Sequence, residues 1–131
     1  MRWRVVIPVF AAVLAVGVAA RVMTGAPVDA DVNDSGALNA LKFAVVEHNK
    51  ATNDLYLSQV ARIIRVQKQV VAGMKYIITA ELGKTPCRKG GADQECTVHE
   101  DQSKARPYQC TFTVWSKPWQ SFIQLEDEKC S

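Results

Sequence analysis

The spacing of apolar residues predicts a single amphipathic helix near the start of the folded region. Over residues 34–50 apolar side chains recur at intervals of three and four, which places them on one helical face. Asp34 and Ser35 are candidates for the residue that caps the helix, since both types accept hydrogen bonds from a first turn. We expect a helix of about four turns. Its buried face would contain Leu38, Leu41, Ala44, Val45 and His48.

Beyond this helix the pattern becomes that of β-strands. Residues 57–71 are rich in Val and Ile and predict one long strand. Apolar and polar residues largely alternate over 74–82 and alternate strictly over 108–114, while a short apolar run at 122–125 predicts a last strand. The connections are too short for crossover helices, so the strands should be antiparallel. The predicted fold class is α+β, with three or four antiparallel strands packed on one long helix.

Two segments show no regular period. Residues 21–32 contain Gly25 and Pro27, and we interpret them as an extended, flexible N-terminal arm. Residues 84–107 contain two prolines, two adjacent glycines and many charges, which predicts a long surface excursion.

The first twenty residues have the pattern of a secretory signal peptide. Arg2 and Arg4 precede an almost unbroken apolar run that ends in small residues. The run is shorter than the roughly twenty residues of a membrane span. We therefore divide the chain into a signal peptide, 1–20, and a secreted domain, 21–131, that has no membrane partner.

Four cysteines lie in the second half of the chain, at Cys87, Cys96, Cys110 and Cys130. An even number of cysteines in a short secreted chain indicates two disulfides, for which three connectivities exist. The alternative is a zinc site that uses Cys96 and His99. The short spacing alone is a weak signal, and the oxidising compartment argues against it.

Charge and motifs exclude several classes of function. The chain has 16 Lys and Arg against 13 Asp and Glu, and two of the arginines belong to the leader, so no basic surface for nucleic acid remains. No hydrolase elbow, metalloprotease motif or phosphate-binding glycine loop occurs. We interpret His48 as a packing residue and residues 126–128 as a solvated acidic chain end. We expect a protein that is not an enzyme and has no cofactor or metal.

One surface modification is suggested by the sequon that begins at Asn33. The alternative is that the Asn33-Asp34-Ser35 segment serves only to cap the helix.

Two predicted turns are unexpectedly apolar. Residues 69–73 must turn if the flanking strands pair, yet only Gly73 readily adopts a positive φ angle. Pro118 should end the strand before it, which leaves Trp119 in the next turn. In an antiparallel meander these two turns share one end of the sheet and would form a hydrophobic wedge there. The alternatives are that the first two strands continue and that Trp119 belongs to the core.

These residues together resemble the cystatins. Gln69-Val70-Val71-Ala72-Gly73 is similar to their Gln-x-Val-x-Gly hairpin motif, Pro118-Trp119 to their second hairpin, and Gly25 to their N-terminal glycine. The leader and the four cysteines resemble the secreted, type 2 members. The resemblance covers the whole secreted domain. It implies a sheet wrapped around a long helix, the pairs Cys87–Cys96 and Cys110–Cys130, and reversible inhibition of papain-like cysteine peptidases such as cathepsins.

The resemblance also implies how the inhibitor binds. Both hairpins would fill the primed side of the peptidase cleft, and the arm before Gly25 would lie in the non-primed side. Thr24 stands where the family often has an apolar residue, so we expect the arm to contribute less than usual. The residues expected to contact the peptidase are Gly25, Gln69, Val70, Val71, Ala72, Gly73, Pro118 and Trp119.

Residues 50–54 resemble the second inhibitory site of some type 2 members, which acts on the asparaginyl endopeptidase legumain. Legumain would recognise Asn53 in this segment, and the alternative is that Asn53 only ends the helix. A different role for the whole fold, as a receptor-binding or antimicrobial module without inhibitory activity, is the main competing hypothesis. We expect a monomer, with the long first hairpin as a candidate for domain swapping into a dimer.

Overall fold

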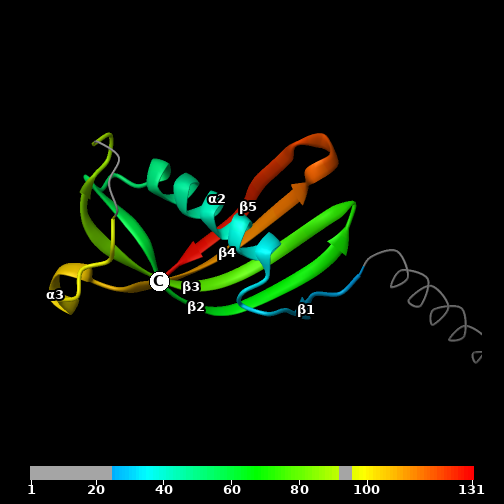
Figure 1. The fold of residues 1–131 in the computed structure, drawn as a ribbon, viewed down its shortest axis with the longest axis horizontal. Helices are drawn as coiled ribbons and strands as arrows, with labels where there is room; N and C mark the ends of the chain where they lie inside the picture. Colours follow the sequence, from blue (N-terminus) through cyan, green and yellow to red (C-terminus); the bar gives the residue numbers. More distant parts are fainter. Residues whose placement is uncertain (1–24, 92–95) are drawn as a thin grey trace, which may run out of the picture.

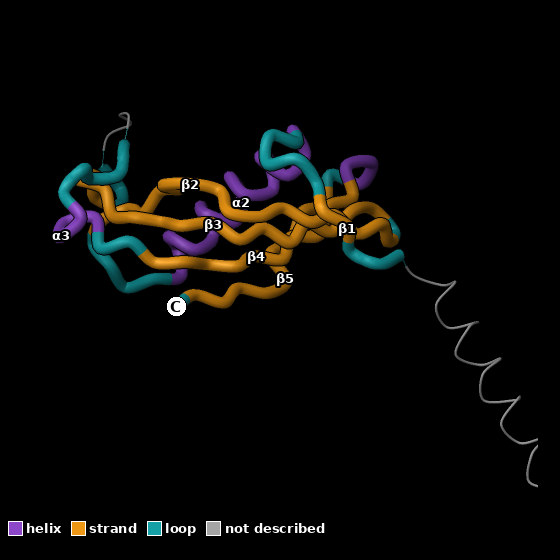
Figure 2. Tube along the Cα trace, turned by 90° about the horizontal axis from the view of Figure 1, so that it is seen from below, coloured by secondary structure: helices purple, strands orange, loops and turns teal. Residues whose placement is uncertain are grey.

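A single antiparallel sheet and one long helix form the molecule in the computed structural model, which describes residues 25–91 and 96–131. The helix α2 lies across one face of the sheet (Figure 1), and the strands follow one another in chain order (Figure 2). The predicted α+β fold is confirmed, with five strands instead of three or four. The elements are β1 (Val28–Asp29), α2 (Ser35–Ala51), β2 (Tyr56–Val71), β3 (Gly73–Arg88), α3 (Gln102–Ala105), β4 (Tyr108–Lys117), the 3₁₀ helix η2 (Pro118–Gln120) and β5 (Phe122–Cys130).

The long helix begins where the sequence predicts. The Asp34 carboxylate accepts a hydrogen bond from the Ala37 N–H at 3.0 Å, so Asp34 is the N-cap. At the other end the Thr52 N–H donates to the His48 carbonyl. One expected member of the buried face is wrong: Leu38 is 41% exposed, because it lies beside the open edge of the sheet and not over its centre.

The hydrophobic core fills the space between α2 and the sheet. The largest fully buried apolar side chains come from the three central strands, and small helix residues allow the helix to approach them closely. Burying each large side chain contributes roughly 1.5–3 kcal/mol. These core residues are Ala37, Ala40, Leu41, Ala44, Val45, Val66, Ile78, Ala80, Leu82, Cys110, Phe112 and Val114.

His48 is the polar member of this interface. Its Nδ1 pairs with the Glu128 carboxylate, and its Nε2 lies 2.7 Å from the Tyr108 hydroxyl. Tyr108 in turn donates to the Ser58 hydroxyl at 2.8 Å. The interpretation of His48 as a packing histidine is therefore confirmed. Glu128, however, is not part of a solvated chain end, because its side chain reaches from β5 to His48 of the helix.

The N-terminal arm is partly ordered, which corrects the prediction for residues 25–32. Val28 and Asp29 form β1 and pair with Lys68 and Gln67 of β2. The Ala30 N–H donates to the Val66 carbonyl at 2.9 Å. A strand of two residues is too short to produce an alternating pattern, so its partner strand and not its own sequence defines it.

The second correction concerns the segment predicted as a surface excursion from residue 84. The strand β3 continues to Arg88 and keeps pairing with the start of β2. Pro86 lies where the register shifts between Tyr56 and Ser58, and a bulge tolerates proline because the ladder needs no donor there. The last strand, β5, is likewise longer than expected.

The disulfides join Cys87 to Cys96 and Cys110 to Cys130, so the pairing implied by the cystatin resemblance is confirmed. Cys96 is thereby excluded as a zinc ligand. Within the described ranges, no helix has both the length and the apolar character that a membrane crossing requires. The predicted signal peptide, 1–20, and the start of the arm, 21–24, lie outside the described residues.

Candidate functional site

The β2–β3 hairpin turns within the apolar segment that the sequence singled out. Val71 pairs with Gly73, so Ala72 is at the tip of the turn. Gly73 has a φ of +96°, and a Cβ atom at this position would collide with the Ser116 carbonyl oxygen of the neighbouring strand. Val70 is 64% exposed. The alternative that the two strands simply continue past this segment is wrong.

The β4–β5 connection also has the predicted form. β4 ends at Lys117, and Pro118 opens the single turn η2. Ser121 closes this turn with a φ of +51° and donates its N–H to the Pro118 carbonyl at 3.0 Å. Trp119 is 67% exposed, so it is not a core residue.

Trp115 joins the two hairpins, and sequence analysis did not identify it as a site residue. Its indole N–H donates to the Ala72 carbonyl at 2.8 Å. Its ring packs edge-on against Phe122, and the Lys117 ammonium lies over both rings at 4.4 and 4.6 Å from their centroids. The sequence did offer one signal for this role. Trp115 directly follows the apolar position Val114 and so lies on the other face of the strand, where its indole N–H can seek a hydrogen-bond partner.

The start of the described chain lies against the first hairpin. The Gln69 side-chain amide donates to the Gly25 carbonyl at 2.9 Å. A Cβ atom on Gly25 would approach the Val70 carbonyl oxygen to 3.2 Å. The structure thus brings Gly25, Gln69 and Val70 together, as the sequence motifs suggested. The other arm residues that would enter a cleft, 21–24, are not described.

These three segments form one end of the molecule, on the side away from α3 (Figure 1). We call the two hairpin tips the wedge, defined as Val70, Val71, Ala72, Gly73, Pro118 and Trp119. The wedge residues carry no nucleophile and no acid or base, so this surface is suited to binding and not to reaction. Its hydrogen-bonded scaffold holds the apolar side chains in place before any partner arrives.

The one cluster of metal-ligating residue types within the described ranges lies elsewhere. His48, Cys110, Glu128 and Cys130 have ligand atoms within 4.8 Å of one another. Cys110 and Cys130 are bonded to each other, and both His48 nitrogens face protein partners. The arrangement therefore stabilises the fold and does not offer a coordination site.

The loop after α2 presents Asn53 at the surface. The helix ends at Ala51 with Thr52 as its C-cap, so the alternative that Asn53 ends the helix is wrong. Both neighbours of Asn53 are anchored. The Lys89 ammonium donates to the Thr52 carbonyl at 2.6 Å, and the Lys84 ammonium lies 2.6 Å from the Asp54 carboxylate. The hydrogen bond from Lys84, together with one from the Tyr56 N–H, lowers the pKa of Asp54.

Comparison with known proteins gives the family. The model of the cystatin domain matches residues 25–119, which include Gly25, both hairpins and Trp119. This chain belongs to the cystatin family, a family of cysteine-peptidase inhibitors. A cystatin of Oncorhynchus mykiss is 53% identical over 130 residues, covering 99% of this chain and 98% of the relative. A cystatin-C of Paralichthys olivaceus is 54% identical over 126 residues, covering 95% and 97%.

A solved cystatin has the same fold. The crystal structure of dimeric human cystatin F superposes with a TM-score of 0.77 and 31% identity, over 85% of this chain and 90% of that one. The resemblance to the cystatins stated from the sequence motifs is thereby confirmed.

Proposed function

We propose that this cystatin is a secreted, reversible, tight-binding inhibitor of papain-like cysteine peptidases such as cathepsins. The observation that carries the proposal is the bond between the Trp115 indole and the Ala72 carbonyl, which fixes two exposed apolar hairpins side by side. Such a surface loses little conformational freedom on docking. The two disulfides fit an oxidising extracellular compartment, and the leader, 1–20, fits secretion.

The wedge would enter the primed side of the peptidase cleft. Trp119 and Val70 are 67% and 64% exposed, and an exposed tryptophan is the type of aromatic anchor that dominates binding energies. Their burial contributes about 25 cal/mol per Å² before the costs of association. The remaining wedge residues, Val71, Ala72, Gly73 and Pro118, would complete the contact.

Gly25 and the arm before it would occupy the non-primed side. Gln69 holds the Gly25 carbonyl, so the chain leaves the hairpin at a fixed point. We propose that this bond directs the arm past the catalytic thiolate without presenting a peptide carbonyl for attack. Arm and wedge then bind one cleft together, and each raises the effective concentration of the other.

The test is the inhibition constant of the secreted protein for papain. We expect Trp119→Ala to raise this constant by about 30-fold or more, which is the effect of a typical hot-spot residue. Leu55→Ala is the matched control, because Leu55 is also an exposed apolar residue, 64% exposed, but precedes the other end of β2. Equal effects of the two substitutions would contradict the proposal.

A second activity is supported by the loop that carries Asn53. We propose that Asn53 is presented to legumain, because its neighbours Thr52 and Asp54 are held by two lysines and the Asn53 side chain is exposed. Asn53→Lys should abolish inhibition of legumain and leave inhibition of papain unchanged. Unchanged inhibition of both enzymes would dismiss this second site.

The active form would be the monomer. Exchange of the first hairpin between two copies would open the turn at Ala72 and remove half of the wedge, so a swapped dimer should not inhibit papain. Size-exclusion chromatography of the inhibitory fraction tests this. A correctly oxidised monomer that fails to inhibit would instead favour the non-inhibitory secreted module.

A further inference from the structure

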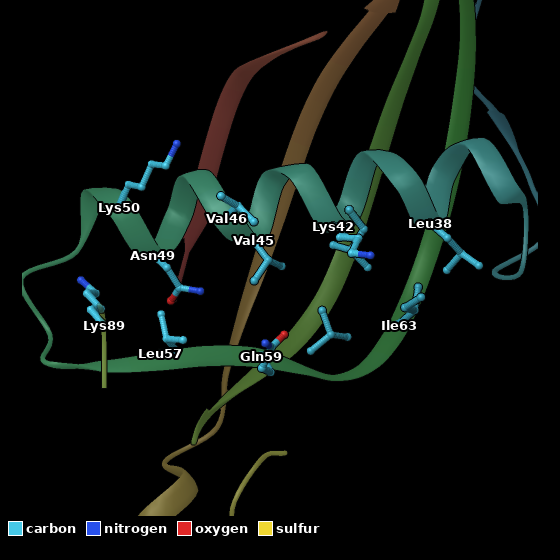
Figure 3. Close-up of a pocket in the computed structure, with 12 residues that line it drawn as sticks. Leu38, Lys42, Val45, Val46, Asn49, Lys50, Leu57, Gln59, Ile63 and Lys89 are labelled. Atoms are coloured by element: carbon cyan, nitrogen blue, oxygen red, sulfur yellow. The ribbon is translucent and has the colours of Figure 1, made fainter. Parts of the chain in front are cut away.

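An open groove lies between α2 and the first half of β2, apart from the wedge (Figure 3). Its volume is about 570 Å³, which is within the range of roughly 300–1,000 Å³ found for small-molecule sites. None of its lining residues belongs to the wedge. Two of them lie next to the Asn53 loop, since Lys50 precedes it in the helix and Lys89 donates to Thr52.

The groove exists because the edge of the sheet is only partly covered. β1 pairs with β2 at Lys68 and Gln67 alone, so the earlier part of β2 is paired with β3 on one side and has no strand on its outer edge. Leu41 and Val45 of the helix are buried at the base of the groove, whereas Leu38 and Val46 at its margin are 41% and 48% exposed. Leu57 and Ile63 line the opposite wall (Figure 3).

The charged residues that line this apolar groove are all lysines. Three lysines line it, Lys42, Lys50 and Lys89, and no carboxylate does. Lys50 pairs with Glu47 at 3.1 Å and points away from the groove (Figure 3), and the Lys89 ammonium donates to Thr52. Lys42 has no hydrogen bond or ion pair among the residues that the structure describes. It is therefore the cation available to a ligand.

We propose that this groove binds one single-chain anionic amphiphile, a free fatty acid. The acyl chain would lie against Leu41, Val45 and Leu57, and the carboxylate would pair with the Lys42 ammonium. The combination of an apolar floor, a positive rim and no acid favours this class over a cationic amphiphile or a basic peptide. The small volume suits one chain and not a folded partner.

The first experiment is calorimetric titration of the secreted, delipidated protein with dodecanoate below its micellar concentration. We expect saturable binding of one molecule per protein. Dodecyltrimethylammonium has the same chain length with the opposite charge and should bind about tenfold more weakly or worse. Equal binding of both amphiphiles, or binding of neither, would overturn the proposal.

The second experiment assigns the site. Lys42→Glu should weaken dodecanoate binding by about tenfold or more, because it replaces the attracting charge by a repelling one. Lys129→Glu is the matched control, since this lysine is 81% exposed and lies on β5. Both variants should inhibit papain as the unsubstituted protein does, which separates this site from the proposed inhibitory surface.

Other occupants give different results. Binding to anionic phosphatidylserine vesicles without binding of monomeric dodecanoate would assign the face to a membrane surface. A concentration-dependent dimer in sedimentation that Val46→Glu dissociates would assign it to a second copy of the chain. Either outcome would overturn the fatty-acid proposal.

Discussion

At the scale of single residues, Gly73 connects the fold to the proposed function. Its φ of +96° and the closeness of the Ser116 carbonyl leave no room for a side chain. Gly73→Ala should therefore displace one hairpin from the other, at a cost in the free energy of unfolding of about 1–3 kcal/mol and with weaker inhibition of papain. Urea unfolding and the inhibition constant measure the two effects.

The chain contains its own control for backbone strain. Gly90 has a φ of +75°, but a Cβ atom at Gly90 would meet nothing within 4 Å. Gly90→Ala should share the conformational cost and leave papain inhibition unchanged. If both substitutions reduced inhibition equally, contact between the hairpins at Gly73 would not be the cause.

Residue-level prediction succeeded where a local property decides the outcome. Gly73, Pro118 and Trp119 lie as predicted, because turn chemistry and the missing proline N–H act within a few residues. Trp115 was missed as a site residue because its partner, the Ala72 carbonyl, is distant in sequence and adjacent only through strand register. Glu128 was misinterpreted for the same reason, since its partner His48 is on the helix.

At the scale of elements, an ion pair joins the start of α2 to β2. The Lys68 ammonium lies 2.8 Å from the Asp34 carboxylate, and its hydrogen bond lowers the pKa of Asp34 below the ordinary value of 3.8, with help from the Ala37 N–H. A carboxyl group whose pKa is lower in the folded than in the unfolded state stabilises the protein at pH values above its unfolded-state pKa. This stabilisation is lost as the pH falls through the folded-state pKa. The pair should thus contribute to acid sensitivity below about pH 4.

Asp34→Asn tests this contribution without removing the cap, because Asn caps helices about as well as Asp. The free energy of unfolding should fall less steeply in Asp34→Asn than in the unsubstituted protein between about pH 5 and pH 2. Lys68→Gln should reduce the slope similarly, since it removes the partner. Unchanged pH profiles in both variants would show that the pair does not couple protonation to folding.

Sequence patterns predicted the elements that have long, regular faces. The helix and the strand β4 were found because their own residues repeat with the right period. β1 and the end of β3 were missed. β1 is two residues long, and the end of β3 contains Gly83 and Pro86, so pairing with β2 defines both.

At the scale of the whole molecule, the two disulfides should stabilise the fold unequally. Cys110–Cys130 spans 20 residues and Cys87–Cys96 spans 9. The loss of chain entropy in the unfolded state then makes the longer closure more stabilising by about 0.7 kcal/mol. Cys110→Ala with Cys130→Ala should therefore lower the free energy of unfolding more than Cys87→Ala with Cys96→Ala. Urea unfolding of the two double variants measures the difference, and the reverse order would contradict it.

The central claim is that three segments at one end of the sheet occupy a peptidase cleft without being cleaved. Active-site titration of papain with the secreted protein, followed by mass spectrometry of the recovered inhibitor, tests it most directly. The account predicts that activity falls linearly to zero near one equivalent and that the inhibitor is recovered intact. Full papain activity at excess inhibitor, or inhibition accompanied by cleavage next to Gly25 or within the hairpins, would contradict the account.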